Sequence, residues 1–323
     1  MNYFQQALEG NGKVYASNSI MTYTMTQADD FVITPSIYDD TYIDFLLNFC
    51  KKEAISVIVS CFDIDLPVLA ANKKRFLENG IDVIVSDLSV TKICNDKWLT
   101  YKKLEELGIG TPHTFLNLEE VECKLLSKEL TYPLILKPRW GMGSIGIYKA
   151  ENEEELKVLY KKLKREIFST YLRFESEEDK EHCIVIQEML YAQEYGLDVL
   201  NDLNGNFVTV IAKKKKAMRA GETDIAEIVP NTQFLEVGKK LSAGMKHIAN
   251  LDVDCFIDDN GKLYILEMNC RFGGQYPFSH IAGVDFPRQI VEWLSGNGTK
   301  QELITPTIGV ESCKDLTPVI IKK

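Results

Sequence analysis

The stretch Leu263-Tyr264-Ile265-Leu266-Glu267-Met268-Asn269-Cys270-Arg271 decides the fold of this chain. Its apolar beginning is typical of a strand, on which Glu267, Asn269 and Arg271 would share one face because side chains alternate. That face begins with apolar residues, and three polar groups on it would be costly to bury without a partner. The stretch therefore predicts a strand that ends in a ligand-binding site.

A second strand precedes this one. The Asn260-Gly261 turn predicts an antiparallel hairpin with Val253 to Ile257, which brings Asp254 within reach of Glu267. Together with the Asn269 amide, these carboxylates are the oxygen ligands that Mg²⁺ prefers, and phosphate and water would complete its coordination. The alternative is a surface hairpin with incidental acids, which does not account for the apolar neighbours.

A glycine-rich segment, 139–146, lies between two further predicted strands, 133–138 and 147–149. Small residues there would let the backbone approach a phosphate and offer N–H groups to it. These residues are Gly141, Gly143, Ser144 and Gly146. Lys137 adds a cation beside the loop, which favours a triphosphate over the alternative of an ordinary glycine-rich hairpin. The segment is not a P-loop, because no GK[ST] sequence follows.

Two polar positions follow the next predicted strand, 183–187. The segment Gln187-Glu188-Met189-Leu190 could read an adenine edge through free backbone groups, and Glu194 could accept ribose hydroxyls. Acidic residues after strands are common, so this pattern carries little weight by itself.

The first ninety residues alternate short β-rich runs, near 13–17, 31–34, 56–60 and 82–85, with amphipathic segments, which predicts a parallel, doubly wound sheet. The chain opens with a helical pattern at 2–8, and no leading strand with a glycine turn precedes it. No GxGxxG motif follows, which argues against a dinucleotide-binding domain. We expect one helix over 91–107 and a C-terminal tail that packs back on the core.

Composition excludes several classes of protein. The net charge of −10 argues against a nucleic-acid surface. No apolar run is long enough to span a membrane, and no signal segment opens the chain. The eight cysteines form no CxxC pair, so we expect reduced thiols in a cytoplasmic protein and no structural zinc.

The ordered set of motifs resembles the ATP-grasp superfamily. The set comprises Asp96-Lys97, Pro133 through Pro138, the 141–146 loop, Gln187-Glu188, Glu194, Asp254 and Glu267-x-Asn269-x-Arg271. It is most similar to single-copy proteins like the synthetase half of the carbamoyl-phosphate synthase large subunit, over about residues 1–295. The resemblance implies an α/β and α+β architecture, an ATP-grasp fold with a Rossmann-like N-terminal domain that here lacks its first strand. The implied units are a Rossmann-like domain (1–95), a lid subdomain (96–186), a C-terminal subdomain (187–296) and a tail (297–323).

The resemblance also implies a role for each motif residue. Lys97 and Lys137 would bind ATP phosphates, with the glycine loop over them. Glu188 and the Leu190 backbone would hold adenine beside Gln187, and Glu194 the ribose. Asp254, Glu267 and Asn269 would hold one or two Mg²⁺ ions, for which Mn²⁺ could substitute. Arg271 would steady the transferred phosphoryl group, and Arg219 would contact a substrate carboxylate or phosphate.

The reaction implied is ADP-forming ligation of a small-molecule carboxylate to an amine through an acyl phosphate, in a chain that could form a homodimer. Carbamoyl phosphate synthesis is not expected, because the chain holds no ATP-grasp duplicate and no allosteric domain. Two alternatives stay open: an ATP-binding protein without turnover, and an ATP-dependent carboxylase.

Two further features have competing interpretations. The run Lys213-Lys214-Lys215-Lys216 reads as a solvated edge or loop, as four lysines in a row usually do. His280 either lines the substrate pocket or simply packs, and the other histidines are expected to be structural or exposed.

Overall fold

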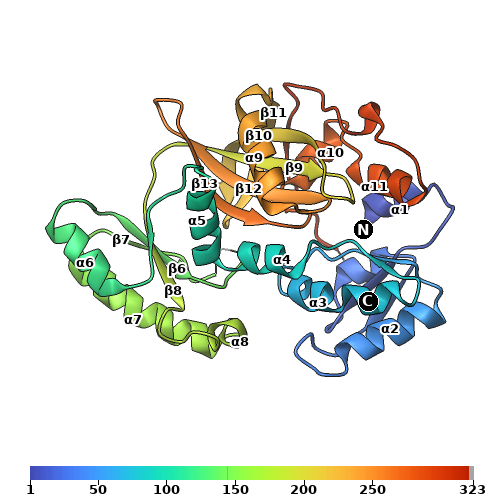
Figure 1. Cartoon of the computed structure of the whole chain (residues 1–323), viewed down its shortest axis with the longest axis horizontal. Helices are drawn as coiled ribbons and strands as arrows, with labels where there is room; N and C mark the ends of the chain where they lie inside the picture. Colours follow the sequence, from blue (N-terminus) through green and yellow to red (C-terminus); the bar gives the residue numbers. More distant parts are fainter. Residues whose placement is uncertain (144, 320–323) are drawn as a thin grey trace.

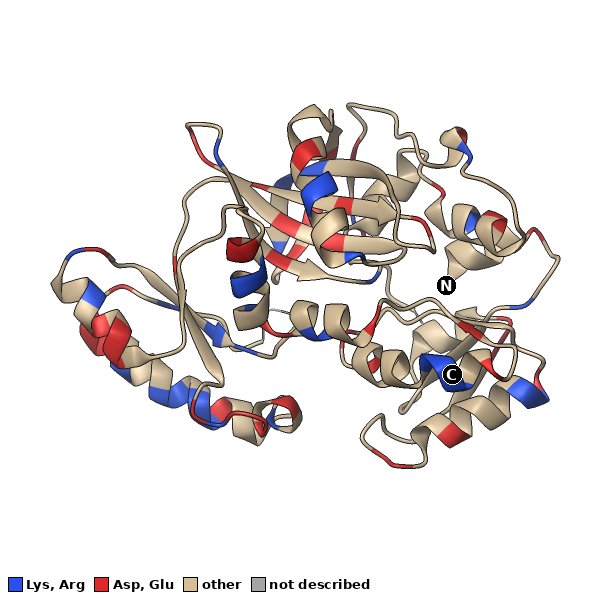
Figure 2. Ribbon diagram, in the orientation of Figure 1, with Lys and Arg blue, Asp and Glu red and all other residues tan. Residues whose placement is uncertain are grey.

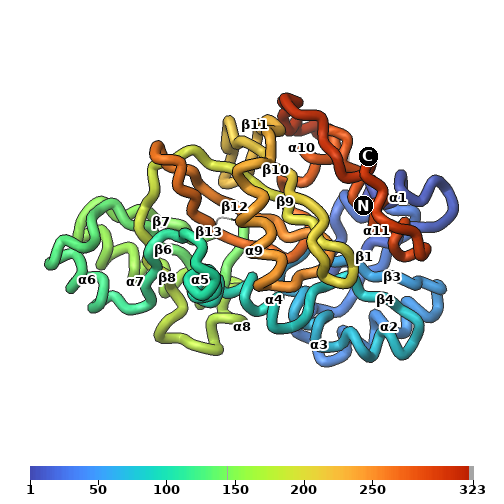
Figure 3. The backbone as a smooth tube through the Cα atoms, turned by 45° about the horizontal axis from the view of Figure 1, so that its top comes forward, coloured from blue at the N-terminus to red at the C-terminus, as the bar shows by residue number. Residues whose placement is uncertain are grey.

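The computed structural model describes residues 1–143 and 145–319. Three units follow one another along the chain: an N-terminal α/β unit, a lid built on a four-stranded sheet, and a larger unit built on a six-stranded sheet. Figures 1 and 3 place the lid at one end of the molecule and the N-terminal unit toward the other. None of the described helices is both long and apolar enough to cross a membrane.

The N-terminal unit contains two pairs of parallel strands with helices between them. β1 pairs with β2 and β3 pairs with β4, both parallel, as the alternation of strands and helices predicts. Its elements are α1 (Asn2–Leu8), β1 (Tyr15–Asn18), η1 (Tyr23–Gln27), β2 (Asp30–Ile33), α2 (Tyr42–Lys52), β3 (Val57–Ile58), α3 (Asp65–Leu77) and β4 (Asp82–Val83). The predicted opening helix is confirmed by α1, whereas the absence of a first strand stays a prediction.

The prediction of a single helix over 91–107 is wrong. Two helices, α4 (Leu88–Asn95) and α5 (Lys97–Glu106), meet at Asp96, whose backbone is extended. The Asp96 carboxylate accepts the N–H groups of Trp98 and Leu99, so it caps α5. It also receives a bidentate hydrogen bond from Arg139 in the lid. A side chain committed to these partners ends one helix and begins the next.

The lid has an antiparallel sheet in the order β5-β8-β6-β7, with helices packed on it. Its elements are β5 (Thr114–Phe115), α6 (Leu118–Leu126), β6 (Leu134–Pro138), β7 (Tyr148–Ala150), α7 (Glu153–Ser169), α8 (Arg173–Ser176) and β8 (Ile184–Glu188). The Asn152 side chain caps α7, which buries Leu156, Leu163 and Ile167 against the sheet. Figure 2 shows acidic and basic residues along the rest of this helix.

The six-stranded sheet has the order β13-β12-β9-β10-β11-β14, and its neighbours are antiparallel. Its strands are β9 (Gln193–Asn201), β10 (Phe207–Arg219), β11 (Glu222–Val229), β12 (Asn250–Ile257), β13 (Leu263–Asn269) and β14 (Glu311–Cys313). The remaining helices are η2 (Thr232–Phe234), α9 (Leu235–Met245), α10 (Tyr276–Ile281), α11 (Phe286–Leu294) and η3 (Gln301–Leu303). Gly261, at φ +79°, forms the predicted hairpin turn between β12 and β13, and Gly205, at φ +80°, forms the turn between β9 and β10. The predicted packing of the tail is confirmed, because β14 pairs with β11.

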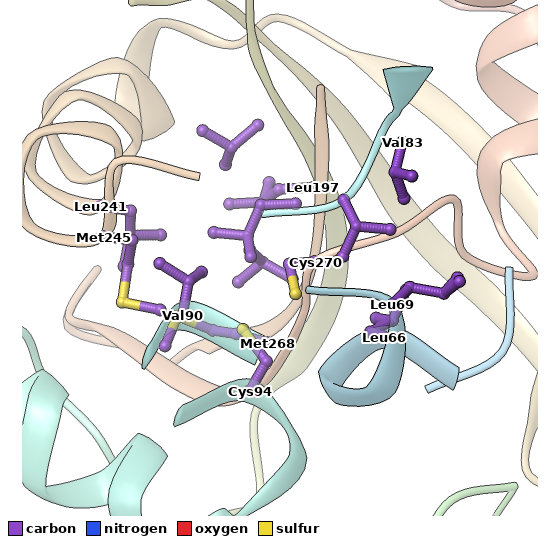
Figure 4. Close-up of a cluster of buried hydrophobic side chains, with 14 of the residues drawn as sticks. Leu66, Leu69, Val83, Val90, Cys94, Leu197, Leu241, Met245, Met268 and Cys270 are labelled. Carbon is purple, nitrogen blue, oxygen red and sulfur yellow. The ribbon is translucent and has the colours of Figure 1, made fainter. Parts of the chain in front are cut away.

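One hydrophobic core joins the N-terminal unit to the six-stranded sheet. Leu66, Leu69 and Val83 from the N-terminal unit belong to the same cluster as Leu197 and Met268 from the sheet. Figure 4 shows that Val90 and Cys94 of α4 belong to this cluster too, on the side of Met268 away from Leu66 and Leu69. The lid has a separate core around Leu136, Leu156 and Ile184. The N-terminal unit and the six-stranded sheet therefore share one hydrophobic core, and the lid has a core of its own.

Candidate functional site

The predicted hairpin brings the acidic residues together. Asp254 lies opposite Glu267, and Asp252 lies opposite Asn269, in the register of β12 and β13. The face predicted for Glu267 is wrong, however. A bulge skips Leu266, so Ile265 and Met268 both enter the core and Glu267 lies on the opposite face. The polar side chains therefore avoid the apolar side of the strand.

The lysine run is not a solvated edge, which corrects the expectation from sequence. Lys213 is fully buried and bonds Asp198 at 2.5 Å, inside the antiparallel pair of β9 and β10. Lys215 is also buried, and its Nζ lies 2.6 Å from Glu194 and 2.7 Å from Asp254. Burial opposes the charge of Lys215, but the two carboxylates outweigh it and raise its pKa. Lys215 therefore links the residue predicted for ribose with a residue predicted for metal.

Gln275 holds the acidic residues of β12 in place. Its Nε2 donates to Asp252 at 2.7 Å and to Asp254 at 3.0 Å. A Cβ on Gly196 would lie 1.5 Å from the Gln275 Oε1 atom, so only glycine leaves room for this amide. Burial, followed by the charge of Asp254, raises the pKa of Asp252 to about 7.

Arg271 lies past the end of β13 and not on its polar face as predicted. Its Nε and Nη2 contact the two oxygens of Asp63 at 2.8 Å, and its Nη1 lies 3.4 Å from Asp252. Asp63 follows β3, so this ion pair ties the N-terminal unit to the end of the hairpin. The guanidinium is committed to these partners, and a role on a phosphoryl group stays a prediction.

Lys137 and Lys97 bring positive charge to the hairpin from the lid side. The Lys97 Nζ lies 3.8 Å from a Glu267 oxygen and donates to the Gly141 carbonyl at 2.5 Å. Lys137, at the end of β6, is only 4% exposed and forms no ion pair within residues 1–143 and 145–319. Burial lowers its pKa to about 8, and the charge of Glu267 acts in the opposite direction. A buried lysine in this state is suited to an anionic ligand.

The glycine loop follows Lys137 directly. Gly143 and Gly146 have φ values of +61° and +71°, which favour glycine. A Cβ on Gly146 would lie 2.8 Å from Leu163, so a side chain there would also push the loop away from α7. Ser144, predicted to bind phosphate, lies outside the described residues.

The segment that joins the lid to the larger sheet has free backbone groups, as adenine recognition would require. β8 ends at Glu188, and no backbone hydrogen bond to Met189 or Leu190 occurs within the described chain. The Glu188 carboxylate accepts the His113 N–H at 2.8 Å, so its side chain braces this segment. Gln187 is buried and donates to Thr114 at 2.8 Å, which assigns its side chain to the lid sheet.

Arg219 is not brought to this cluster. It lies at the exposed end of β10, where it pairs with Asp224 and donates to the Lys314 carbonyl at 3.2 Å. His280 stacks on Tyr3 at 3.7 Å between ring centroids, so the packing interpretation accounts for it.

The oxygen donors of the hairpin fit a hard divalent cation. Asp254 and Glu267 face each other, and the Asn269 amide follows one strand repeat later. Among the described residues no group of three or more His, Cys, Asp or Glu side chains is gathered as a preformed metal site. The predicted set has only two carboxylates, so a bound phosphate would have to supply further oxygens.

Three residues of this site were not predicted from the sequence, namely Lys215, Asp63 and Gln275. Lys215 could have been found, because Ile211, Lys213 and Lys215 repeat with the period of a strand that begins apolar. Asp63 and Gln275 carry no such signal, since Asp63 comes from the N-terminal unit and Gln275 from the loop after β13.

Two α+β subdomains that hold lysines against a carboxylate hairpin, beside an α/β domain, define the architecture of ATP-grasp proteins. A family model described as "ATP-grasp domain" matches residues 94–275, more than half of the chain. The chain therefore belongs to the ATP-grasp family, as its motifs predict. A second model, described as "PylC-like, N-terminal domain", matches residues 1–84.

Relatives by sequence are large chains of carbamoyl phosphate synthase. The arginine-specific large chain of Bacillus subtilis is 21% identical over 85% of this chain, and the carbamoyl phosphate synthase large chain of Clostridium acetobutylicum is 23% identical over 89%. The chain spans about a quarter (26%) of the length of each relative.

Solved structures share the fold. L-amino acid ligase from Bacillus licheniformis has a TM-score of 0.74 and 19% identity, over 99% of this chain and 78% of its own. Biotin carboxylase from Campylobacter jejuni also has a TM-score of 0.74, with 18% identity, over 97% of this chain and 72% of its own.

Proposed function

We propose that this protein is an ATP-dependent carboxylate–amine ligase that forms ADP through an acyl phosphate. The observation that carries the proposal is Lys137, a buried cation without an ion-pair partner in the described chain, beside the Asp254–Glu267 pair. The similar structures support the proposal, since an L-amino acid ligase and an N5-carboxyaminoimidazole synthetase with ADP share the fold.

Different elements of the site bind different parts of the ATP molecule. Lys97, Lys137 and the glycine loop receive the phosphates, and the backbone at Met189 and Leu190 receives adenine. Glu194 receives the ribose. Because Glu194 bonds Lys215 at 2.6 Å, this lysine would lie next to the nucleotide when Glu194 binds the ribose. We assign it a place at the phosphates as well, which sequence reasoning missed.

Asp254, Glu267 and Asn269 would hold Mg²⁺, or Mn²⁺ in its place. When bound, the ion supplies charge neutralisation for the phosphate oxygens. Lys215 bonds Asp254 at 2.7 Å and so balances this carboxylate in the protein alone.

The reaction proceeds in two displacements. A carboxylate oxygen of the substrate attacks the γ-phosphorus, ADP leaves, and an acyl phosphate results. The amine then attacks the acyl carbon, phosphate leaves, and the nitrogen releases a proton as the amide forms. Lys97 and Lys137 stabilise charge that develops on the transferred group. No covalent link to the protein is needed, because positioning and electrostatics supply the acceleration.

The test is a phosphate-release screen in which small carboxylates are paired with amines, with bicarbonate as a separate acceptor. We expect ADP formation that requires both members of one pair. ATP binding without phosphate release across the panel would support a protein without turnover. Phosphate release that requires bicarbonate, and no other carboxylate, would support a carboxylase. The proposal also includes small-molecule substrates, as in the family, and a homodimeric assembly. Analytical sedimentation would test the assembly.

A further inference from the structure

A cavity lies on the N-terminal unit, beside the residues of the candidate site. It encloses about 310 Å³ and is lined by segments that follow the carboxyl ends of β1, β2 and β3. Ligands of α/β proteins often bind at such strand ends. Tyr171, from the connection between α7 and α8 of the lid, forms part of the wall. The cavity therefore lies where two units meet.

The cavity has hydroxyl groups and a single carboxylate. The polar lining includes Ser17, Asn18, Ser19, Thr34 and Ser36. Among the described residues that line the cavity, Asp65 is the only one charged at neutral pH, and none is a lysine or arginine. Its carboxylate accepts a hydrogen bond from Ser60 at 3.3 Å and has no ion-pair partner within the described chain. The position at the start of α3 compensates this charge only in part.

Aromatic side chains form part of the cavity wall. Tyr38, Phe62 and Tyr171 line it and stay 40%, 45% and 39% exposed. Tyr38 stacks on Phe174 of the lid at 3.9 Å, and its hydroxyl donates to Glu175 at 2.7 Å. Ring faces and a carboxylate together attract an ammonium group, whereas they offer nothing to a carboxylate ligand.

This cavity adjoins the predicted phosphate site. Ile64 lines both this cavity and a smaller one whose walls include Glu267, Asn269 and Gly141. Glu175, which holds Tyr38, lines the smaller cavity. A ligand in the larger cavity would therefore lie beside the point where an acyl phosphate forms.

We propose that this cavity binds the amine substrate as its ammonium ion, with Tyr38, Phe62 and Tyr171 as the aromatic wall and with Asp65 as the counter-ion that takes one proton and leaves the free amine for the attack on the acyl carbon. This assignment rests on the proposed ligase function. It predicts amine substrates that carry no free carboxylate near the ammonium group, because the described residues that line the cavity include no lysine or arginine to pair with one. Burial raises the pKa of Asp65 to about 6, which leaves it ionised at neutral pH.

Calorimetric titration without turnover tests the assignment. The probes are primary amines from ethanolamine to 1,5-diaminopentane, each matched with a carboxylate of the same length, in the presence of ADP. We expect at least one amine to bind while its carboxylate partner does not, and Asp65→Asn to weaken that amine at least tenfold. Asp40→Asn, which changes an exposed carboxylate outside the cavity, is the matched control. Tyr171→Ala, at an exposed wall position, should also weaken the amine while ADP affinity stays unchanged in every variant.

The assignment fails if amines and carboxylates bind alike, or if Asp65→Asn and Tyr171→Ala bind the amine as the wild type does. The ligase proposal fails separately. Amine binding that depends on Asp65, with no phosphate release for any pair, would keep the cavity assignment and remove the reaction. Amine-dependent phosphate release with an unchanged KM for the amine in both variants would keep the reaction and place its amine elsewhere.

Discussion

Asp254 and Glu267 lie directly opposite each other on β12 and β13, yet they have different partners. Asp254 is bonded by Lys215 and Gln275, whereas the one side-chain contact of Glu267 within the described residues is with Lys97 at 3.8 Å. Glu267 is therefore the carboxylate of this pair with the greater freedom to accept a cation. Its substitution should affect activity more than stability.

We expect Glu267→Gln to lower metal-dependent ATP turnover at least a hundredfold, about 2.7 kcal/mol of barrier. Gln keeps the volume but removes the charge that binds a divalent ion. Phosphate release at saturating Mg²⁺ measures the effect, and circular dichroism checks the fold. Glu236→Gln, at an exposed position on α9, should leave turnover intact. Unchanged turnover in Glu267→Gln would remove this residue from the metal site.

Lys137→Met should weaken ATP binding at least tenfold, about 1.4 kcal/mol, because a phosphate loses its buried cation. The same change should not lower the melting temperature, since the ammonium is desolvated without an ion-pair partner in the described chain. Calorimetry with ATP and a thermal melt measure the two effects. Lys149→Met on β7, which is exposed, serves as the control. Equal ATP affinity in wild type and Lys137→Met would contradict the assignment.

Lys213→Met should lower the free energy of unfolding by about 3–5 kcal/mol, because it leaves Asp198 buried without its counter-ion. Adding Asp198→Asn should restore most of that loss, since Asn can still bond Ser279. Urea denaturation measures both. Loss of the exposed Lys239–Glu236 pair by Lys239→Met should cost less than about 0.5 kcal/mol. A double variant no more stable than the single one would refute the charge argument.

Acid should destabilise the fold through His247. Burial lowers its pKa to about 4, so between pH 6.5 and 4 the unfolded chain binds a proton that the folded chain does not. Stability from this residue is complete above pH 6.5 and is lost as the pH falls, by about 2 kcal/mol from pH 7 to pH 5. Asp65 and Asp252, with raised pKa values, act in the opposite direction over the same range.

The contribution of His247 is therefore isolated by comparison with His247→Gln, which can still donate to the Val199 carbonyl. The wild type should lose about 2 kcal/mol relative to this variant between pH 7 and pH 5, by urea denaturation. His182→Gln, at an exposed histidine, should show no such difference.

Local patterns predicted much of the fold and part of the candidate site. The Asn260-Gly261 turn and the acids on either side of it were sufficient to place Asp254 opposite Glu267. The bulge at Leu266 shifts the buried positions from Ile265 to Met268 and Cys270, but the adjacent apolar pair Ile265-Leu266 does not show which of the two residues faces the core. The break at Asp96 depends on Arg139 in another unit, and the burial of Lys213 depends on Asp198 in the neighbouring strand. The residues next to Asp96 or Lys213 in the sequence do not show that Arg139 or Asp198 will be its partner.

The lid core is separate from the two clusters that pack on the six-stranded sheet, so we expect two units of cooperative unfolding. The lid core around Leu136 and Ile184 can melt while the core shared by the N-terminal unit and the six-stranded sheet stays intact. Heating should therefore produce two calorimetric transitions and not one, and a single midpoint would describe neither unit. A nucleotide held between the lid and the sheet should bring the two transitions together, because it binds only when both units are folded.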